Sequence, residues 1–203
     1  KPQSGFAAND IKTALQKKGF TVKFSELSSL TEKNIGKKIV IALESNQQVK
    51  TLFLKQGGSQ VKKQGEQAYT LRTTTNLAMS YWTLGGDDNG AMYGGLQVAE
   101  DINFNGFVKI DDTECSPYVK KRGIKFNIPL DKRAPTYEND NGGTSHKVAI
   151  EHVWDMTFWK EYFDEMARNR FNVLTLWNPH PFTSMLDMEV KYPGIAIEDV
   201  EGY

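Results

Sequence analysis

Hydrophobic and polar residues follow two periods along the first half of the chain, one typical of helices and one typical of strands. The predicted elements are helices over residues 9–18, 46–55 and 89–102, and strands over residues 20–24, 38–43, 67–73 and 76–82. Gly19 is expected to end the first helix. The run at 38–43 is almost wholly apolar, which indicates a strand buried on both faces. This half of the chain therefore predicts a small α/β domain.

A second pattern begins at Arg122. Residues 122–127 and 172–177 are short, mostly apolar runs, and residues 155–169 between them have helical spacing, with Asp155 as the expected N-cap. The apolar stripe of this helix consists of Phe158, Trp159, Tyr162, Phe163, Met166 and Ala167. Such a stripe is typical of a core face packed on a sheet. Strand, helix and strand in that order form a βαβ unit, which predicts two parallel strands.

Polar and aromatic side chains gather around these two strands. Parallel strands place their carboxyl ends at one edge of a sheet, which is where such folds bind ligands. The candidate substrate-binding residues are Arg122, Asn127, Trp177, Asn178 and His180. Amide, imidazole and guanidinium groups beside an aromatic ring are common in carbohydrate sites. Two structural alternatives stay open: Trp177 and His180 packed against a neighbouring domain, and Arg122 as a surface residue before a strand.

The length of the chain, 203 residues, suits one large domain or two small ones. The segment 111–121 is charged, contains Ser116-Pro117 and has little periodicity, so we place the junction there. We expect an accessory α/β domain over residues 1–112 and the start of a (β/α)8 barrel over residues 118–203. Because a complete barrel needs roughly 200 residues or more, the predicted fold class is α/β: a small α/β sandwich domain followed by the first βαβ portion of an incomplete (β/α)8 barrel.

Charge and composition narrow the classes of function. Lysine plus arginine and aspartate plus glutamate each number 25, so no net charge favours nucleic acid or an anionic membrane. No apolar run approaches the roughly 18 residues of a membrane span, and no signal-peptide pattern opens the chain. The start at Lys1 without Met suggests a processed or engineered N-terminus. Cys115 follows an acidic residue, which disfavours a reactive thiolate.

Three motifs argue against nucleotide and metal chemistry. Gly85-Gly-Asp-Asp-Asn-Gly90 precedes a predicted helix, but the Lys-Ser/Thr pair of a phosphate-binding loop does not follow, and its aspartates would repel a phosphate. A tight strand-to-helix turn explains it better. The acidic pairs at 87–88 and 111–112 lack the spacing of a calcium loop, and the interval from His146 to His152 does not match a helical zinc motif. We expect no metal and no cofactor.

A resemblance to known enzymes adds to these expectations. Glu66-Gln-Ala-Tyr-Thr-Leu71 and Gly86-Asp-Asp-Asn-Gly-Ala-Met-Tyr-Gly94 resemble the small α/β domain that precedes the catalytic barrel in glycoside hydrolases, namely β-hexosaminidases of family 20 and α-glucuronidases of families 67 and 115. Arg122-Gly123 resembles the Arg-Gly that opens the first barrel strand of family 20, where the arginine binds sugar hydroxyls. Family 20 usually has an aspartate near the end of that strand, and this chain has Asn127.

The resemblance implies the N-terminal part of a secreted or periplasmic glycoside hydrolase, with an oligosaccharide or polysaccharide as substrate. Glycoside hydrolysis ordinarily needs two carboxyl groups across the scissile bond. The acidic residues that match no catalytic motif are Glu138, Asp155, Asp164, Glu165, Asp187 and Glu189. The acid and base would therefore come from later strands, and this chain alone should be inactive.

Other interpretations stay open. The alternative function is a non-enzymatic carbohydrate-binding or protein-interaction module. The uncovered edges of an incomplete barrel predict self-association, unless the first domain or further barrel strands cover them. The sugar, its linkage and the stereochemical course of the reaction do not follow from the sequence.

Overall fold

The computed structural model describes residues 2–33, 36–76, 78–106, 112–127 and 155–177. The chain divides into an N-terminal unit, Lys1–Lys120, and a C-terminal unit, Lys121–Tyr203. This division falls inside the segment 111–121, where the sequence places the domain junction. The identity of the two units as an accessory domain and the start of a barrel stays a prediction.

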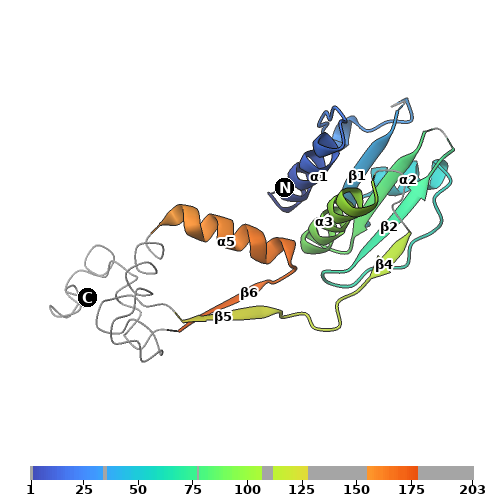
Figure 1. Cartoon of the computed structure of the whole chain (residues 1–203). Coiled ribbons are helices and arrows are strands. Elements are labelled where there is room, and N and C mark those ends of the chain that lie inside the picture. Colours follow the sequence, from blue (N-terminus) through green and yellow to red (C-terminus); the bar gives the residue numbers. More distant parts are fainter. Residues whose placement is uncertain (1, 34–35, 77, 107–111, 128–154, 178–203) are drawn as a thin grey trace, which may run out of the picture. The chain divides into compact units, whose positions relative to one another are not determined.

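The described part of the N-terminal unit is a sheet with helices on both faces (Figure 1). The helices are α1 (Pro2–Lys17), α2 (Gln47–Lys55) and α3 (Asp88–Asn105), with a short 3-10 turn, η1, at Leu27–Ser29. The strands are β1 (Lys38–Leu43), β2 (Tyr69–Thr74), β3 (Ser80–Gly85) and β4 (Thr113–Cys115), in the order β1-β3-β2-β4. β1 is parallel to β3, while β2 is antiparallel to both β3 and β4. The predicted α/β class is confirmed.

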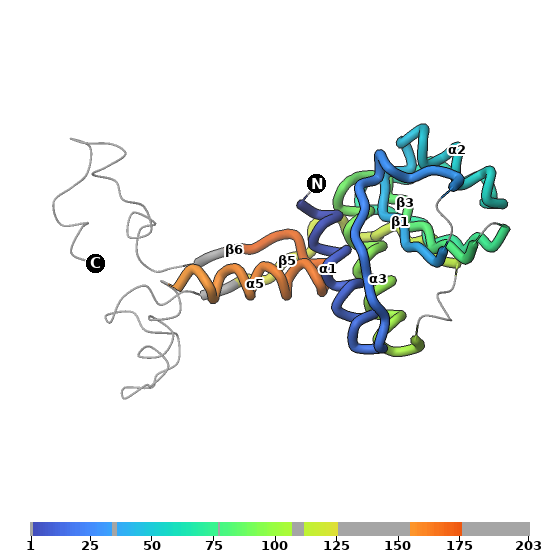
Figure 2. Tube along the Cα trace, turned by 90° about the horizontal axis from the view of Figure 1, so that it is seen from above, coloured from blue at the N-terminus to red at the C-terminus, as the bar shows by residue number. Residues whose placement is uncertain are grey.

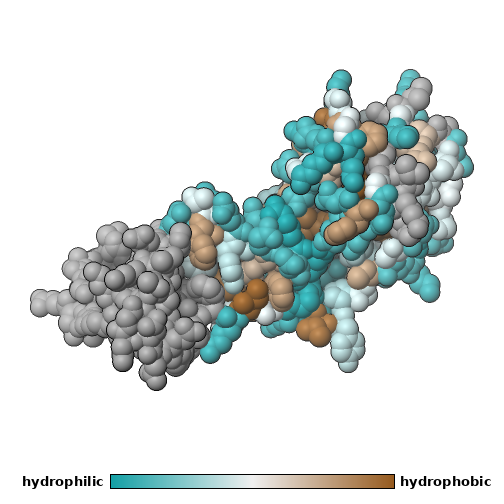
Figure 3. Space-filling model, in the orientation of Figure 1, coloured by the Kyte–Doolittle hydropathy of each residue, from teal (hydrophilic) through white to brown (hydrophobic). Residues whose placement is uncertain are grey.

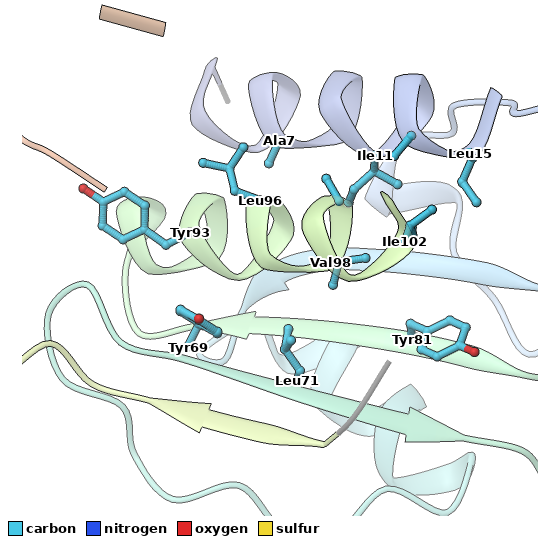
Figure 4. Packing of buried hydrophobic residues seen from close by; sticks show 12 residues of the cluster. Ala7, Ile11, Leu15, Tyr69, Leu71, Tyr81, Tyr93, Leu96, Val98 and Ile102 are labelled. Atoms are coloured by element: carbon cyan, nitrogen blue, oxygen red, sulfur yellow. The ribbon is translucent and has the colours of Figure 1, made fainter. Parts of the chain in front are cut away.

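The sheet separates two hydrophobic clusters, because successive residues of a strand point to opposite faces. Tyr69, Leu71 and Tyr81 pack in the cluster that includes α1 and α3. Trp82 and Leu84 pack in the cluster that includes α2. Figure 4 shows α3 lying between the sheet and α1, with the side chains of both helices directed into the first cluster. The sheet therefore has α3 and α1 on one face and α2 on the other, and α3 contacts both the sheet and α1 in the larger cluster.

Small residues allow α3 to approach both of its neighbours closely. A methyl group added to Gly94 would lie 2.5 Å from Cγ2 of Thr83 in β3. A methyl group added to Gly95 would lie 2.7 Å from Cβ of Ala7 in α1. Figure 2, viewed from above, shows the same side-by-side course of α1 and α3. The two glycines therefore fix how near the sheet and α1 come to α3.

The first helix is longer than predicted. It begins at Pro2 rather than at Asn9, and Ala7, in the part that the sequence pattern missed, is fully buried. Its predicted end at Gly19, which has φ 84°, is confirmed. The N–H of Gly19 donates to the Gln16 carbonyl and the N–H of Phe20 donates to the Leu15 carbonyl, which together form a Schellman motif. Tertiary packing, which local propensity does not report, extends the helix at its start.

The strand predicted over residues 20–24 is wrong, because this segment has no regular secondary structure. Val22 packs against the cluster of α1 and α3, whereas Leu27 and Leu30 pack against the cluster of α2. The segment therefore crosses an edge of the sheet, and the Gln48 side-chain amide holds its far end by donating to the Leu30 carbonyl at 2.9 Å. Of the alternating apolar residues, Val22 packs against a cluster whereas Phe20 and Phe24 are exposed, so the pattern reflects neither strand pairing nor a continuous buried face.

The other strands agree with the predicted ones to different degrees. β1 has the predicted bounds, and residues on both of its faces pack in the two clusters. β3 runs from Ser80 to Gly85, later than the predicted 76–82. The fourth strand of the sheet is β4, a short edge strand inside the predicted junction. The N-terminal unit thus includes residues beyond the predicted end at 112.

The described part of the C-terminal unit contains β5 (Gly123–Asn127), α5 (Met156–Arg168) and β6 (Val173–Trp177). β5 and β6 pair in parallel, which confirms the predicted βαβ order. Asp155 caps α5 as expected, since its carboxylate accepts the N–H of Thr157 at 2.8 Å.

The apolar stripe of α5 is less buried than predicted. Its aromatic rings contact one another along the helix, but Met166 is its one residue that is buried, and Phe163 is 49% exposed. On the face shown in Figure 3, hydrophilic residues cover most of the described surface and hydrophobic residues appear in small patches. The prediction that this stripe is a core face is wrong for Phe163, because that side chain is exposed.

Replacing Gly94 with alanine tests the close approach of α3. We expect Gly94→Ala to lower the free energy of unfolding by about 1–3 kcal/mol, because the methyl group would overlap Thr83. Gly5→Ala in α1 is the matched control. Nothing lies within 4 Å of the position of its added carbon, so it should raise the free energy of unfolding by about 0.5–1 kcal/mol. Urea unfolding followed by circular dichroism measures both, and a neutral Gly94→Ala would contradict the packing described.

Candidate functional site

The carboxyl ends of β5 and β6 bring two of the five candidate residues together. The parallel register pairs Asn127 with Trp177, and each is the last residue of its strand. The prediction that these two ends lie side by side is confirmed. Asn178 and His180 follow β6 and lie outside the described residues. The backbone therefore provides the edge on which a site of this kind is built, while the side-chain roles stay predictions.

Arg122 is not at this edge. It directly precedes Gly123, the first residue of β5, and so lies at the amino end of the strand pair. At about 3.3 Å per residue, the five residues to Asn127 span roughly 16 Å. The structure therefore does not bring Arg122 together with Asn127 and Trp177, and its part in sugar binding stays a prediction.

Arg122 instead joins the start of β5 to the turn before β6. Its N–H donates to Oδ1 of Asn172 at 2.9 Å, and its carbonyl accepts the N–H groups of Asn172 and Val173 at 2.8 and 3.0 Å. Its guanidinium Nε donates to the Arg170 carbonyl at 2.8 Å. The main chain and the side chain of one residue thus fix how the two strands begin, which sets the register of the pair.

The turn that presents the Arg170 carbonyl is the end of α5. Arg170 has φ 59°, a left-handed conformation in which glycine or asparagine is usual. Its N–H donates to the Ala167 carbonyl at 3.0 Å, and the N–H of Phe171 donates to the Met166 carbonyl at 2.8 Å, which together form a Schellman motif. Since no glycine marks the position, the sequence gives no signal for this turn.

The glycine after Arg122 has its own physical reason. A methyl group on Gly123 would lie 2.9 Å from the Val173 carbonyl oxygen and 3.0 Å from Cβ of the same residue. Those contacts are tight enough to push β5 away from β6 at the start of the pair. The Arg-Gly sequence therefore combines a bonded arginine with a residue small enough for close pairing.

The described acidic residues of the C-terminal unit have structural roles. Asp155 caps α5, while Glu161, Asp164 and Glu165 are exposed on that helix, and Glu165 pairs with Arg168 at 2.6 Å. The last three carboxylates therefore lie on the solvent face of the helix. Within the described residues, no three metal-ligating side chains group together. In the same part of the chain, every helix is too short or too polar to span a bilayer.

Burial shifts the pKa of Lys38 and of Tyr81, which both belong to the sheet of the N-terminal unit. Desolvation lowers the pKa of Lys38 at the start of β1 and raises the pKa of Tyr81 in β3, because burial disfavours the charged form of each. The Tyr81 hydroxyl donates to the sulfur of Met79 at 3.2 Å. These shifts follow from core packing and do not indicate an acid and base pair.

The glycine-rich turn before α3 is filled by its own carboxylate. Asp87 caps the helix: its Oδ1 accepts the N–H of Gly90 at 2.7 Å, and its Oδ2 accepts the N–H of Gln67 at 3.0 Å. A side chain on Gly90 would collide with the Ala68 carbonyl oxygen, so the turn also needs a glycine there. The Gly90 N–H at the start of the helix is bonded to the Asp87 carboxylate, which agrees with the interpretation as a tight strand-to-helix turn.

Removing this carboxylate gives a second test. Asp87→Ala should lower the free energy of unfolding by about 1–3 kcal/mol, because two N–H groups lose their acceptor. Asn89→Ala, in the same turn, is the control and should change it by less than about 0.5 kcal/mol. Thermal unfolding with and without inorganic phosphate provides the readout. Stabilisation of the unmodified protein by phosphate would contradict a turn that is already filled.

Comparison with solved structures relates this fold to glycoside hydrolases. The chain matches a GH138 enzyme targeting the pectin rhamnogalacturonan II over 98% of its length, with a TM-score of 0.63 and 20% sequence identity, and covers 26% of that enzyme. It matches a family GH115 4-O-methyl-α-glucuronidase with specificity for decorated arabinogalactans over 88% of its length, with a TM-score of 0.49 and 19% identity, and covers 23% of that chain. No protein-family model and no curated protein sequence matches it.

The chain therefore shares its α/β fold with part of the GH138 enzyme. It spans about a quarter of the length of each of these two solved structures. At these identities the likeness concerns the fold alone. The resemblance to families 20, 67 and 115 in particular stays a prediction.

Proposed function

We propose that this chain is the N-terminal part of a glycoside hydrolase that acts on a complex carbohydrate. The observation that carries the proposal is the match in fold to the GH138 enzyme over 98% of this chain but only 26% of that one. Such a match is what we would expect of one portion of a larger catalytic protein. The pectin target of that enzyme makes pectic polysaccharides the first substrates to test.

The edge formed by β5 and β6 suits sugar binding. Asn127 and Trp177 end neighbouring parallel strands, the position at which barrel folds bind their substrates. An amide can both donate to and accept from sugar hydroxyls, and an indole ring can cover the apolar face of a sugar. We propose that Asn127, Trp177, Asn178 and His180 line the substrate site, with the loop after β6 supplying the last two.

The catalytic carboxylates would come from further strands of the same protein. Hydrolysis needs an acid and a base or nucleophile on opposite sides of the scissile bond. Asp155 is engaged in the cap of α5, and Glu165 is engaged in an ion pair on the surface of that helix. We therefore propose that residues 1–203 bind part of the substrate and do not turn it over.

A comparison of two protein lengths tests this function. The 203-residue chain and a version continued through the natural sequence after Tyr203 are incubated with pectic and other complex polysaccharides, and the release of reducing sugar is measured. The longer protein should hydrolyse at least one substrate, and the shorter one none. Turnover by the 203-residue chain would contradict the proposal. Oligosaccharide binding by the short chain, with no turnover by the long one, would favour a binding module instead.

Substitutions at the strand ends test the site within the longer protein. Asn127→Ala or Asn178→Ala should lower kcat/KM by about three- to ten-fold, which corresponds to the loss of one hydrogen bond to the sugar. Lys125→Ala is the control, because Lys125 is an exposed residue in the middle of β5. Steady-state kinetics on the substrate identified above measures the effect. Unchanged kcat/KM in both asparagine variants would remove this edge from the substrate site.

A further inference from the structure

The turn before β2 makes contacts that the proposed function does not use. Residues 65–68 form a turn closed by a hydrogen bond from the Ala68 N–H to the Gly65 carbonyl at 3.2 Å. Gln67 is the third residue of this turn and has φ 62°. Glycine or asparagine is favoured at that position, since other side chains strain the backbone in a left-handed conformation. A glutamine there needs a compensating role for its side chain.

That side chain reaches a distant part of the chain. Gln67 is only 5% exposed, and its Nε2 donates to the carbonyl of Lys120 at 3.0 Å, across 53 residues of sequence. Its own N–H is held by Asp87 at 3.0 Å, so the cap of α3 also anchors the turn. Both ends of Gln67 are therefore fixed, the main chain to the start of α3 and the amide to Lys120.

Lys120 is the last residue of the N-terminal unit, and Lys121 is the first of the C-terminal unit. Between β4 and this point the chain has no regular structure, Tyr118 is fully exposed and Val119 is 53% exposed. Burial of apolar surface therefore contributes little to holding the segment in place. The ion pair of Lys120 with Glu66, at 3.4 Å, lies at the surface with both side chains 61% exposed, and pairs of that kind contribute little.

We propose that Gln67 is a positioning residue that fastens the connecting segment Ser116–Lys120 to the N-terminal unit. The hydrogen bond from its buried amide fixes the point at which the chain leaves that unit. The proposal does not depend on the proposed function, because it concerns the chain between the two units and not a substrate.

Limited trypsin digestion of the 203-residue protein tests this role, because trypsin cleaves after Lys120, Lys121 and Arg122. Gln67→Gly removes the amide and also relieves the left-handed strain, so the unit should stay folded. Cleavage after Lys120, whose carbonyl accepts this hydrogen bond, should become about five-fold faster, as expected when one hydrogen bond that closes a local opening is lost. Cleavage after Lys23, in an exposed irregular segment of the same unit, should keep its rate.

Two further variants make the result specific. Glu66→Gln removes only the surface ion pair and should leave cleavage unchanged. Gln67→Asn keeps an amide that tolerates the left-handed conformation but is one methylene too short, and it should accelerate cleavage as Gln67→Gly does. Equal cleavage of the connecting segment in the unmodified protein and in both Gln67 variants would overturn the proposal. A parallel increase after Lys23 would also overturn it, since Gln67 would then support the whole unit.

Discussion

The parallel pairing of β5 with β6 is the constraint on which the candidate site depends. The pairing begins where Arg122 bonds to Asn172 and to the Arg170 carbonyl, and Gly123 allows the two strands to approach at that point. A slip of one residue would turn every side chain of a strand to the other face of the sheet. The bonds at the start of the strands therefore decide which residues meet at their ends.

The N-terminal unit has a comparable arrangement around Asp87. One carboxylate caps α3 and holds the main chain of Gln67, and the side chain of Gln67 in turn holds Lys120. The start of a buried helix, a strained turn and the segment that leaves the unit are thus joined by consecutive hydrogen bonds. Asp87 and Gln67, which both lie in the segments that resemble glycoside hydrolases, therefore have a structural role that does not depend on a ligand.

The sequence predicted the elements whose signals are local. β1 coincides with its apolar run, α2 lies within its predicted range with Asn46 as its cap, and α1 ends at the predicted glycine. Signals that depend on the rest of the fold were missed. The start of α1 is stabilised by burial of Ala7 against α3, and the left-handed turn after α5 uses Arg170 where a glycine would have marked it.

The candidate site was also predicted only in part. The order strand, helix, strand was sufficient to predict two parallel strands, and hence that Asn127 and Trp177 end side by side. It was not sufficient for Arg122, because a residue at the start of a strand lies far from its carboxyl end and can bond to a turn that only the folded chain brings near. Resemblance to a family motif identified this arginine, and its contacts show what it bonds in this protein.

Disulfide formation across β5 and β6 tests the central claim most directly. In a Cys115→Ser background, Lys125→Cys combined with Thr175→Cys replaces two exposed register partners of the parallel pair. Mild oxidation should join them readily, because neighbouring strands lie within the Cα separation that a disulfide bridges. Lys125→Cys combined with Val173→Cys is offset by two residues, about 8 Å between Cα atoms, and should stay reduced. Preferential bridging of the offset pair, or of neither, would contradict the register on which the site is built.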